Sequence, residues 1–289
     1  MDFRALLMGL AFVLMWSSAF ATARLIVADA PPLLALSARF LISGGIAVAI
    51  AATLGQSWRI SRSQARSVVI FGLCQNALYL GLNFVAMQTI EASLAVIIAA
   101  SLPLIVALLD WLVRGQRVAP LGLLGLILGM AGVGLIMGTR VQGGADPWGV
   151  VLCIGGATAL AVATLSVRGA SGGGNLLMIV GLQMLVGSLA LGLAGAVLER
   201  PVVTWTPSLI AAFAYQILIP GLAATLLWFR LVGRIGATRA STFHFLNPFF
   251  GVTIAALLLG ESIGPLDVLG VVVVMVGILA VQLSRARAA

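Results

Sequence analysis

Residues 91–113 read EASLAVIIAASLPLIVALLDWLV, a stretch in which Glu91 and Asp110 are the only charged side chains. A helix of about 20 apolar residues is long enough to cross the hydrocarbon core of a bilayer. A helix that is apolar on all sides must also be surrounded by apolar material, because a side facing water would need polar residues. We therefore predict a transmembrane helix here.

Nine further apolar runs of similar length indicate the same structure. The ten expected helices span residues 4–25, 33–54, 66–88, 91–113, 118–139, 147–168, 175–197, 206–229, 237–259 and 264–284. Of the 289 residues, 62% are hydrophobic and only 8% are charged, whereas a soluble domain has about a quarter charged residues. The sequence predicts an all-α integral membrane protein with the lipid bilayer as its main surroundings. The breaks between the runs are too short to hold a separate domain.

The basic residues indicate how the chain is oriented. All 16 of them are arginine. If the helices cross in alternation, twelve arginines fall on the side of the N-terminus and three on the other, with Arg39 inside the second helix. Cytoplasmic loops carry an excess of basic residues, so both termini are expected in the cytoplasm. The net charge of +8 is then explained by arginines that orient the helices in the membrane. The sequence has no stripe of basic residues interleaved with aromatic ones, so we expect no nucleic-acid partner.

An internal repeat appears when the chain is aligned with itself at an offset of 145 residues. The matches without a gap are Pro103 with Pro248, Gly115 with Gly260, Pro120 with Pro265, Gly125 with Gly270 and Gly132 with Gly277. The repeat predicts two halves, 1–140 and 146–289, with five helices each. Because five is odd, the halves must cross the membrane in opposite directions. Two inverted five-helix repeats around a central cavity are a common plan of secondary transporters, whose site lies near the midplane.

Four groups of residues resemble a known family. They are Trp16-Ser17-Ser18-Ala19-Phe20, the pair Arg39-Phe40, the set Ala95, Pro103, Gly115 and Gly125, and its second copy Ala240, Pro248, Gly260-Glu261 and Gly270. Each half resembles an EamA domain, so the chain resembles the ten-helix drug/metabolite transporter (DMT) superfamily. Within it, the resemblance is to bacterial exporters of aromatic and other neutral amino acids. One departure is Gly115-Gln116, where the family often has Gly-Glu.

The resemblance implies a secondary transporter of the bacterial inner membrane that exports small metabolites by alternating access. It also implies that the protein has no ATPase and no bound cofactor. A multidrug or nucleotide-sugar-like transporter of the same superfamily is the alternative. A channel or a membrane-embedded enzyme is disfavoured, since the sequence shows no charged ring, one histidine and few buried acids. We expect no metal site and a functional monomer.

Polar and aromatic residues inside the predicted helices are the candidates for substrate binding, because such groups at membrane depth face a cavity or another helix. The third helix places Gln75, Tyr79 and Asn83 at spacings that form one stripe of an α-helix. The stripe either lines the pathway or bonds to neighbouring helices. The other candidates lie in the first, fourth, eighth and ninth helices: Trp16, Ser17, Ser101, Gln216, Trp228, His244 and Asn247.

The charges near the membrane centre limit the substrate. The first helix has no carboxylate at its middle, which favours a neutral or zwitterionic substrate over a strongly cationic one. Arg39 either holds a substrate carboxylate or extends outward to the interface, and the second interpretation is favoured. Glu91, Glu261 and Asp267 at the outer helix ends are expected to be structural.

Two prolines mark candidate hinges. A proline within a helix frees the carbonyl four residues back, so Pro248 is expected to leave the carbonyl of His244 bare, with Pro103 making the matching kink in the first half. His244 itself either binds substrate or a proton, or is a neutral side chain bonded between helices.

Overall fold

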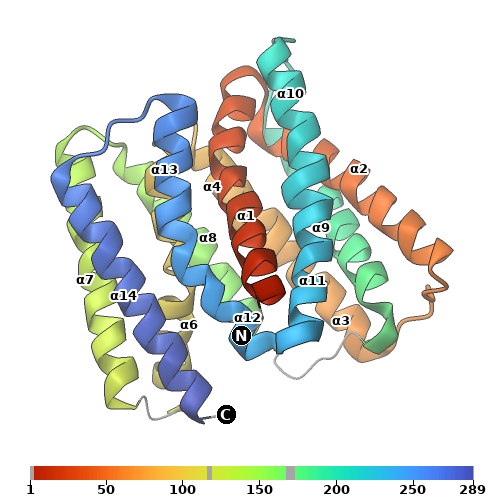
Figure 1. Cartoon of the computed structure of the whole chain (residues 1–289). Coiled ribbons are helices and arrows are strands. Elements are labelled where there is room, and N and C mark those ends of the chain that lie inside the picture. Colours follow the sequence, from red (N-terminus) through yellow and green to blue (C-terminus); the bar gives the residue numbers. More distant parts are fainter. Residues whose placement is uncertain (1–2, 116–118, 167–172, 289) are drawn as a thin grey trace.

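The computed structural model describes residues 3–115, 119–166 and 173–288, and within these ranges the chain is helical apart from short connections and two longer ones, at 54–61 and 199–206 (Figure 1). Among these described residues, ten helical spans are long and apolar enough to cross a membrane, which confirms the expected all-α membrane fold. They are Phe3–Asp29, Pro32–Thr53, Arg62–Ala86, Ala92–Val113, Pro120–Gln142, Pro147–Ser166, Leu176–Leu198, Pro207–Ile235, Arg239–Leu259 and Pro265–Ser284.

Several spans consist of more than one helical segment. The segments are α1 (Phe3–Asp29), α2 (Pro32–Thr53), α3 (Arg62–Phe71), η1 (Gly72–Tyr79), α4 (Leu80–Ala86), α5 (Ala92–Ala100), α6 (Leu102–Arg114), α7 (Pro120–Gln142), α8 (Pro147–Ser166), η2 (Gly173–Asn175), α9 (Leu176–Leu198), α10 (Pro207–Gln216), η3 (Ile217–Ala223), α11 (Ala224–Ile235), α12 (Ala237–Ser241), η4 (Thr242–Leu246), α13 (Asn247–Leu259) and α14 (Pro265–Ala288).

Prolines and glycines set many of the helix boundaries. The helices α2, α6, α7, α10 and α13 have proline in their first two positions, where the missing amide proton breaks no helical bond. Gly115 and Gly260 end α6 and α13 with φ of 64° and 69°, a left-handed conformation that favours glycine. The same residue types therefore begin and end corresponding helices in the two halves.

The irregular segments also recur at the offset of 145 residues. The π-helical segments η1 and η3 begin at Gly72 and Ile217, and the helices α6 and α13 begin at Leu102 and Asn247. Both differences, 217 − 72 and 247 − 102, equal 145. These correspondences support the hypothesis of two related halves. They also show that the fourth and ninth spans are interrupted beside Pro103 and Pro248.

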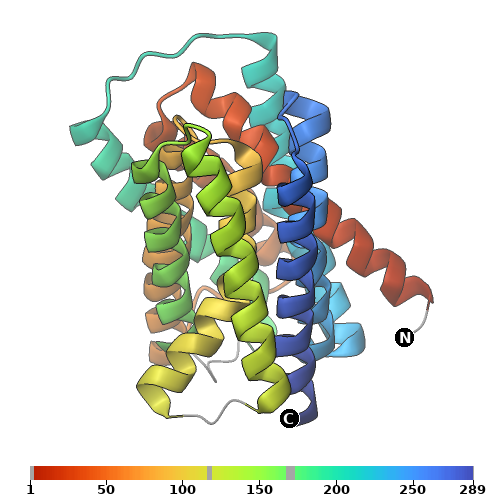
Figure 2. The same cartoon turned by 90° about the vertical axis from the view of Figure 1, so that its left-hand side faces the viewer.

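The two halves contact each other through small residues. The helices α7 and α14 lie side by side in Figures 1 and 2, and α2 packs along α9. A Cβ added at Gly125 would lie 2.7 Å from the carbonyl oxygen of Gly277, and one at Gly132 would lie 3.0 Å from that of Gly270. Close contact between helices in membranes depends on such small residues. The pairing is reciprocal, because Gly125 matches Gly270 in the repeat and Gly132 matches Gly277.

Acidic side chains fix helix starts at one end of the bundle. The carboxylate of Glu261 accepts hydrogen bonds from the amides of Ala92 (2.7 Å) and Ser93 (2.9 Å) at the start of α5. Arg140 forms ion pairs with Glu91 and with Asp267, the latter at 3.0 Å. A carboxylate at a helix N-terminus is stabilised by the free amides and the helix dipole. Glu91, Glu261 and Asp267 therefore have the structural contacts that the sequence predicts.

Candidate substrate pocket

A pocket lies between helices from both halves of the chain. It encloses about 460 Å³ of space free of atoms, including the part that is open to its surroundings. Its lining comes from α1, α2, the end of η1, α4 with the residue that follows it, and the junction of α10 with η3. The lining residues are Trp16, Ala19, Phe20, Ala23, Arg39, Tyr79, Leu80, Asn83, Phe84, Met87, Gln216 and Pro220.

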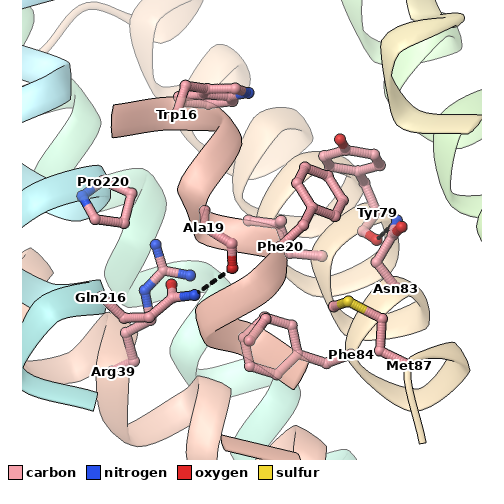
Figure 3. A pocket seen from close by; sticks show the side chains of 12 residues that line it. Trp16, Ala19, Phe20, Arg39, Tyr79, Asn83, Phe84, Met87, Gln216 and Pro220 are labelled. Atoms are coloured by element: carbon pink, nitrogen blue, oxygen red, sulfur yellow. Dashed lines mark hydrogen bonds between the residues drawn. The ribbon is translucent and has the colours of Figure 1, made fainter. Parts of the chain in front are cut away.

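The two π-helical segments shape the walls of the pocket. Tyr79 is the last residue of η1, and Pro220 lies inside η3. A proline within a helix cannot donate the usual backbone hydrogen bond, and π-helical turns are frequent at functional sites. Figure 3 shows Arg39, Gln216 and Pro220 on one side of the α1 segment, with Tyr79 and Asn83 on its other side.

The amide side chains in the pocket are bonded through their nitrogens. Asn83 Nδ2 donates to the carbonyl of Tyr79 at 2.7 Å, and Gln216 Nε2 donates to the carbonyl of Ala19 at 2.6 Å and to Thr22 Oγ1 at 2.9 Å. The amide oxygens of both side chains are buried and have no hydrogen-bond partner. An unpaired buried polar atom costs about 1–3 kcal/mol, so these oxygens are suited to accept a hydrogen bond from a ligand.

Arg39 is buried in the wall of the pocket, and the interpretation that it extends outward to the interface is wrong. Its side chain lies among the lining residues, and the residue is only 6% exposed. Its Nε has no hydrogen-bond partner, and its guanidinium carbon lies 5.1 Å from the ring centre of Phe40. The reason is that this face of α2 meets α1, α4 and the η3 segment, which supply other residues of the pocket lining, so it is covered by protein instead of lipid.

A cluster of aromatic rings adjoins the pocket at Trp16. We call Phe12, Trp16, Trp228 and His244 the aromatic cluster. The ring centres of Phe12 and Trp228 are 4.7 Å apart, those of Trp228 and His244 are 5.3 Å apart, and those of Trp16 and His244 are 6.4 Å apart. Tilted and edge-on contacts at these distances stabilise a compact group of rings. The cluster joins α1, α11 and η4 beside the pocket.

Comparisons with known proteins identify the family of this helical bundle. The EamA-like transporter family matches the chain twice, over residues 3–138 and 147–283. The chain belongs to the EamA-like transporter family. It is thus a membrane transporter of the DMT superfamily, the superfamily that the motifs in its helices resemble. Among the described residues no group of three or more His, Cys, Asp or Glu side chains is arranged to hold a metal ion.

Individual relatives of this EamA-like transporter have names that agree with the family. The Bacillus subtilis (strain 168) protein "Uncharacterized transporter YvbV" is 26% identical over 87% of this chain and 82% of its own length. "Uncharacterized inner membrane transporter YedA" of Escherichia coli (strain K12) is 26% identical over 99% of this chain and 94% of its own length. A solved structure described as "Crystal structure of protein" has a TM-score of 0.65 and 20% identity over 100% of both chains, which shows the shared fold.

The predicted binding residues of this EamA-like transporter fall into three groups. Four of them line the pocket: Trp16, Tyr79, Asn83 and Gln216. The next four are Trp228 and His244 of the aromatic cluster, Asn247, which contacts it, and Ser17, which contacts Asn247. Asn247 Nδ2 is 3.0 Å from His244 Nδ1, and Ser17 Oγ is 3.4 Å from the carbonyl oxygen of Asn247. The last two, Gln75 and Ser101, are not among the residues that line the pocket. Ser101 Oγ donates instead to the carbonyl of Ile98 at 2.6 Å.

The backbone at Pro248 differs from the sequence prediction. The carbonyl of His244 is not bare, because it accepts a hydrogen bond from the amide of Asn247 in the tighter turn of η4. A 3₁₀ turn pairs residues three apart, so it uses the acceptor that a proline would free in an α-helix. Phe20, Phe84 and Met87 also line the pocket, and the sequence does not indicate them, since apolar side chains inside an apolar helix give no distinguishing signal.

Proposed function

We propose that this EamA-like transporter exports small metabolites, and aromatic or other neutral amino acids in particular, by alternating access. The observation that carries the proposal is the pocket at the contact of the two halves. Aromatic rings and amide side chains line it, and none of the twelve lining residues is acidic. A pocket with aromatic walls, few polar groups and no carboxylate suits an amphipathic molecule without a net positive charge.

The proposed movement is a rocking of two inverted halves about the pocket. The interruptions of the fourth and ninth spans, at Pro103 and Pro248, are the proposed hinges. Inverted repeats allow one arrangement of the halves to open the site to one side and its mirror arrangement to open it to the other. Two halves supply both sides of the pathway, so a monomer suffices. Both termini are proposed to be cytoplasmic in a bacterial inner membrane, on the arginine distribution.

Flux into proteoliposomes tests the substrate. The purified protein is reconstituted, and uptake of radiolabelled phenylalanine is compared with that of threonine, a sugar and a quaternary amine. The proposal expects saturable phenylalanine flux and recovery of unchanged phenylalanine inside, as a transporter without covalent chemistry requires. Flux of the quaternary amine alone would favour multidrug efflux, and flux of the sugar alone would favour a sugar-conjugate transporter. Either result contradicts the proposal.

Accessibility of single cysteines tests alternating access. In a background with Cys74→Ala and Cys153→Ala, the variants Phe12→Cys in the aromatic cluster and Met87→Cys at the other end of the pocket are labelled with a water-soluble thiol reagent. Rocking predicts that saturating phenylalanine changes the two labelling rates in opposite directions. Equal changes, or none, would contradict a movement that opens one side as it closes the other.

A further inference from the structure

Arg39 and Gln216 are polar residues of the pocket lining, and each has a side-chain atom without a hydrogen-bond partner. The atom of Arg39 is a donor and that of Gln216 is an acceptor. Arg39 belongs to α2 and is 6% exposed, and Gln216 belongs to α10 and is 0% exposed. The Arg39 Nε and the Gln216 Oε1 are both buried and make no hydrogen bond. Both side chains line the pocket, and Figure 3 shows them on the same side of α1.

The orientation of the Gln216 amide is fixed by its neighbours. Its nitrogen donates to the carbonyl of Ala19 and to Thr22 Oγ1, and a carbonyl oxygen accepts only from the nitrogen end of an amide. The amide oxygen is therefore the atom left for the pocket. A fixed acceptor and a guanidinium in the lining of one pocket are complementary to a molecule that carries both a donor and an anion.

Burial of Arg39 at this depth calls for a negatively charged partner. Arg39 is the eighth residue of α2, about 10 Å along the helix from its start at Pro32. A charged side chain inside a membrane is costly and normally pairs with an acid or with backbone carbonyls. None of the residues that line the pocket with Arg39 is acidic. The partner must then come from the ligand.

We propose that Arg39 binds the carboxylate of the transported molecule and that Gln216 Oε1 accepts a hydrogen bond from its ammonium group. The planar guanidinium matches a carboxylate with two parallel hydrogen bonds. The ammonium of an α-amino acid lies beside its carboxylate, and Gln216 and Arg39 line the pocket on the same side of α1. Trp16 and Phe20 then face the side chain. Arg39 is thus the residue that selects α-amino acids over amines, which deepens the proposed function and rests on it.

Binding of three matched compounds to the purified full-length protein in nanodiscs tests this assignment by calorimetry. They are L-phenylalanine, phenethylamine, which lacks the carboxylate, and 3-phenylpropionate, which lacks the ammonium. Arg39→Gln is expected to raise the Kd of phenylalanine and of 3-phenylpropionate by about tenfold to a hundredfold, the usual effect of a hydrogen bond to a charged group. The same variant should not raise the Kd of phenethylamine, which lacks the carboxylate that Arg39 would bind. Gln216→Leu should weaken the binding of phenylalanine and phenethylamine and leave the binding of 3-phenylpropionate unchanged.

Two further variants separate recognition from structure. Arg200→Gln removes one exposed positive charge in a connection and is expected to change no Kd. Arg39→Lys keeps the positive charge but loses the planar guanidinium that makes two parallel hydrogen bonds. It should therefore weaken phenylalanine binding less than Arg39→Gln does, and it serves as the test variant if Arg39→Gln does not fold. An equal loss of all three compounds, or no change in the ratio of phenylalanine to phenethylamine, would overturn the role of Arg39.

The proposed function and this assignment fail in distinguishable ways. If the wild type binds none of the three aromatic compounds, the aromatic substrate is wrong, and the same comparison is made with threonine and its decarboxylated analogue 1-amino-2-propanol. Preference for threonine that is lost in Arg39→Gln would still support carboxylate recognition. Binding of the amines alone, unaffected by Arg39→Gln, would overturn both. Binding of phenylalanine with the same affinity in Arg39→Gln would overturn the assignment only.

Discussion

The contact between α7 and α14 predicts the effect of a single added methyl group. A Cβ at Gly277 would lie 2.4 Å from the backbone nitrogen of Gly129, 2.5 Å from its Cα and 2.7 Å from the carbonyl oxygen of Gly125. Ordinary contact begins at 3.4 Å, so the two helices would have to separate by 3.4 − 2.4, or about 1 Å. All three atoms belong to backbone, which has no rotamer change to offer. Overpacking of this kind costs about 1–3 kcal/mol.

Gly134→Ala on α7 is the matched control. A Cβ at Gly134 would meet nothing within 4 Å, and the residue is exposed. Replacing glycine by alanine inside a helix gains up to about 1 kcal/mol of intrinsic helix stability in both variants. Titration with a denaturing detergent should therefore give Gly277→Ala a free energy of unfolding about 1–3 kcal/mol below that of Gly134→Ala. Equal stability of the two variants would refute the packing argument.

Three more predictions concern features outside the pocket. Arg140→Gln should lower the free energy of unfolding by about 1–3 kcal/mol in the same titration, because it leaves Glu91 and Asp267 without their shared cation; no loss would show that solvent already screens the pair. Alkaline phosphatase fused to either terminus should be inactive in cells, since the termini are predicted in the cytoplasm; activity of either fusion would contradict that topology. Hydrogen bonds lower the pKa of Asp146 below the ordinary 3.8, and the bond from Thr89 has the largest effect. The ionised Asp146 therefore stabilises the folded protein fully above pH 3.8, and this stabilisation is lost as the pH falls through the lowered pKa. The Tm difference between wild type and Asp146→Asn should shrink only in that acidic range, and a difference that shrinks near neutral pH would be inconsistent with the lowered pKa.

The sequence predicts the spans well because the bilayer imposes a length and a composition that can be read directly. All ten expected spans occur among the described residues, with boundaries that differ by up to six residues; the expected ends at 118 and 168 lie outside the described residues. The repeated prolines and glycines also locate the interruptions near Pro103 and Pro248, since these residues act on the backbone where they stand. Local features of this kind need no knowledge of the neighbouring helices.

The pocket is less predictable because its walls depend on which helix faces are covered. Gln75 lies in η1 about one turn before Tyr79, whereas the pocket lining on this span begins at Tyr79. Spacing alone places Gln75 on the stripe but does not tell how far along the span the pocket extends. The burial of Arg39 depends on the cover that α1, α4 and η3 give to this face of α2. The Ser101 hydroxyl is satisfied by the carbonyl of Ile98, three residues back in the same span. None of these outcomes is encoded in spacing alone.

The most direct test of the proposed pathway is phenylalanine counterflow in proteoliposomes by wild type, Trp16→Ala and Trp205→Ala. Trp16 lines the pocket, whereas Trp205 lies in a connection and is 77% exposed. Transport through the pocket predicts that Trp16→Ala loses most of the counterflow and that Trp205→Ala retains it, with equal amounts of folded protein in the vesicles. Equal counterflow by Trp16→Ala and the wild type would contradict a pathway through this pocket.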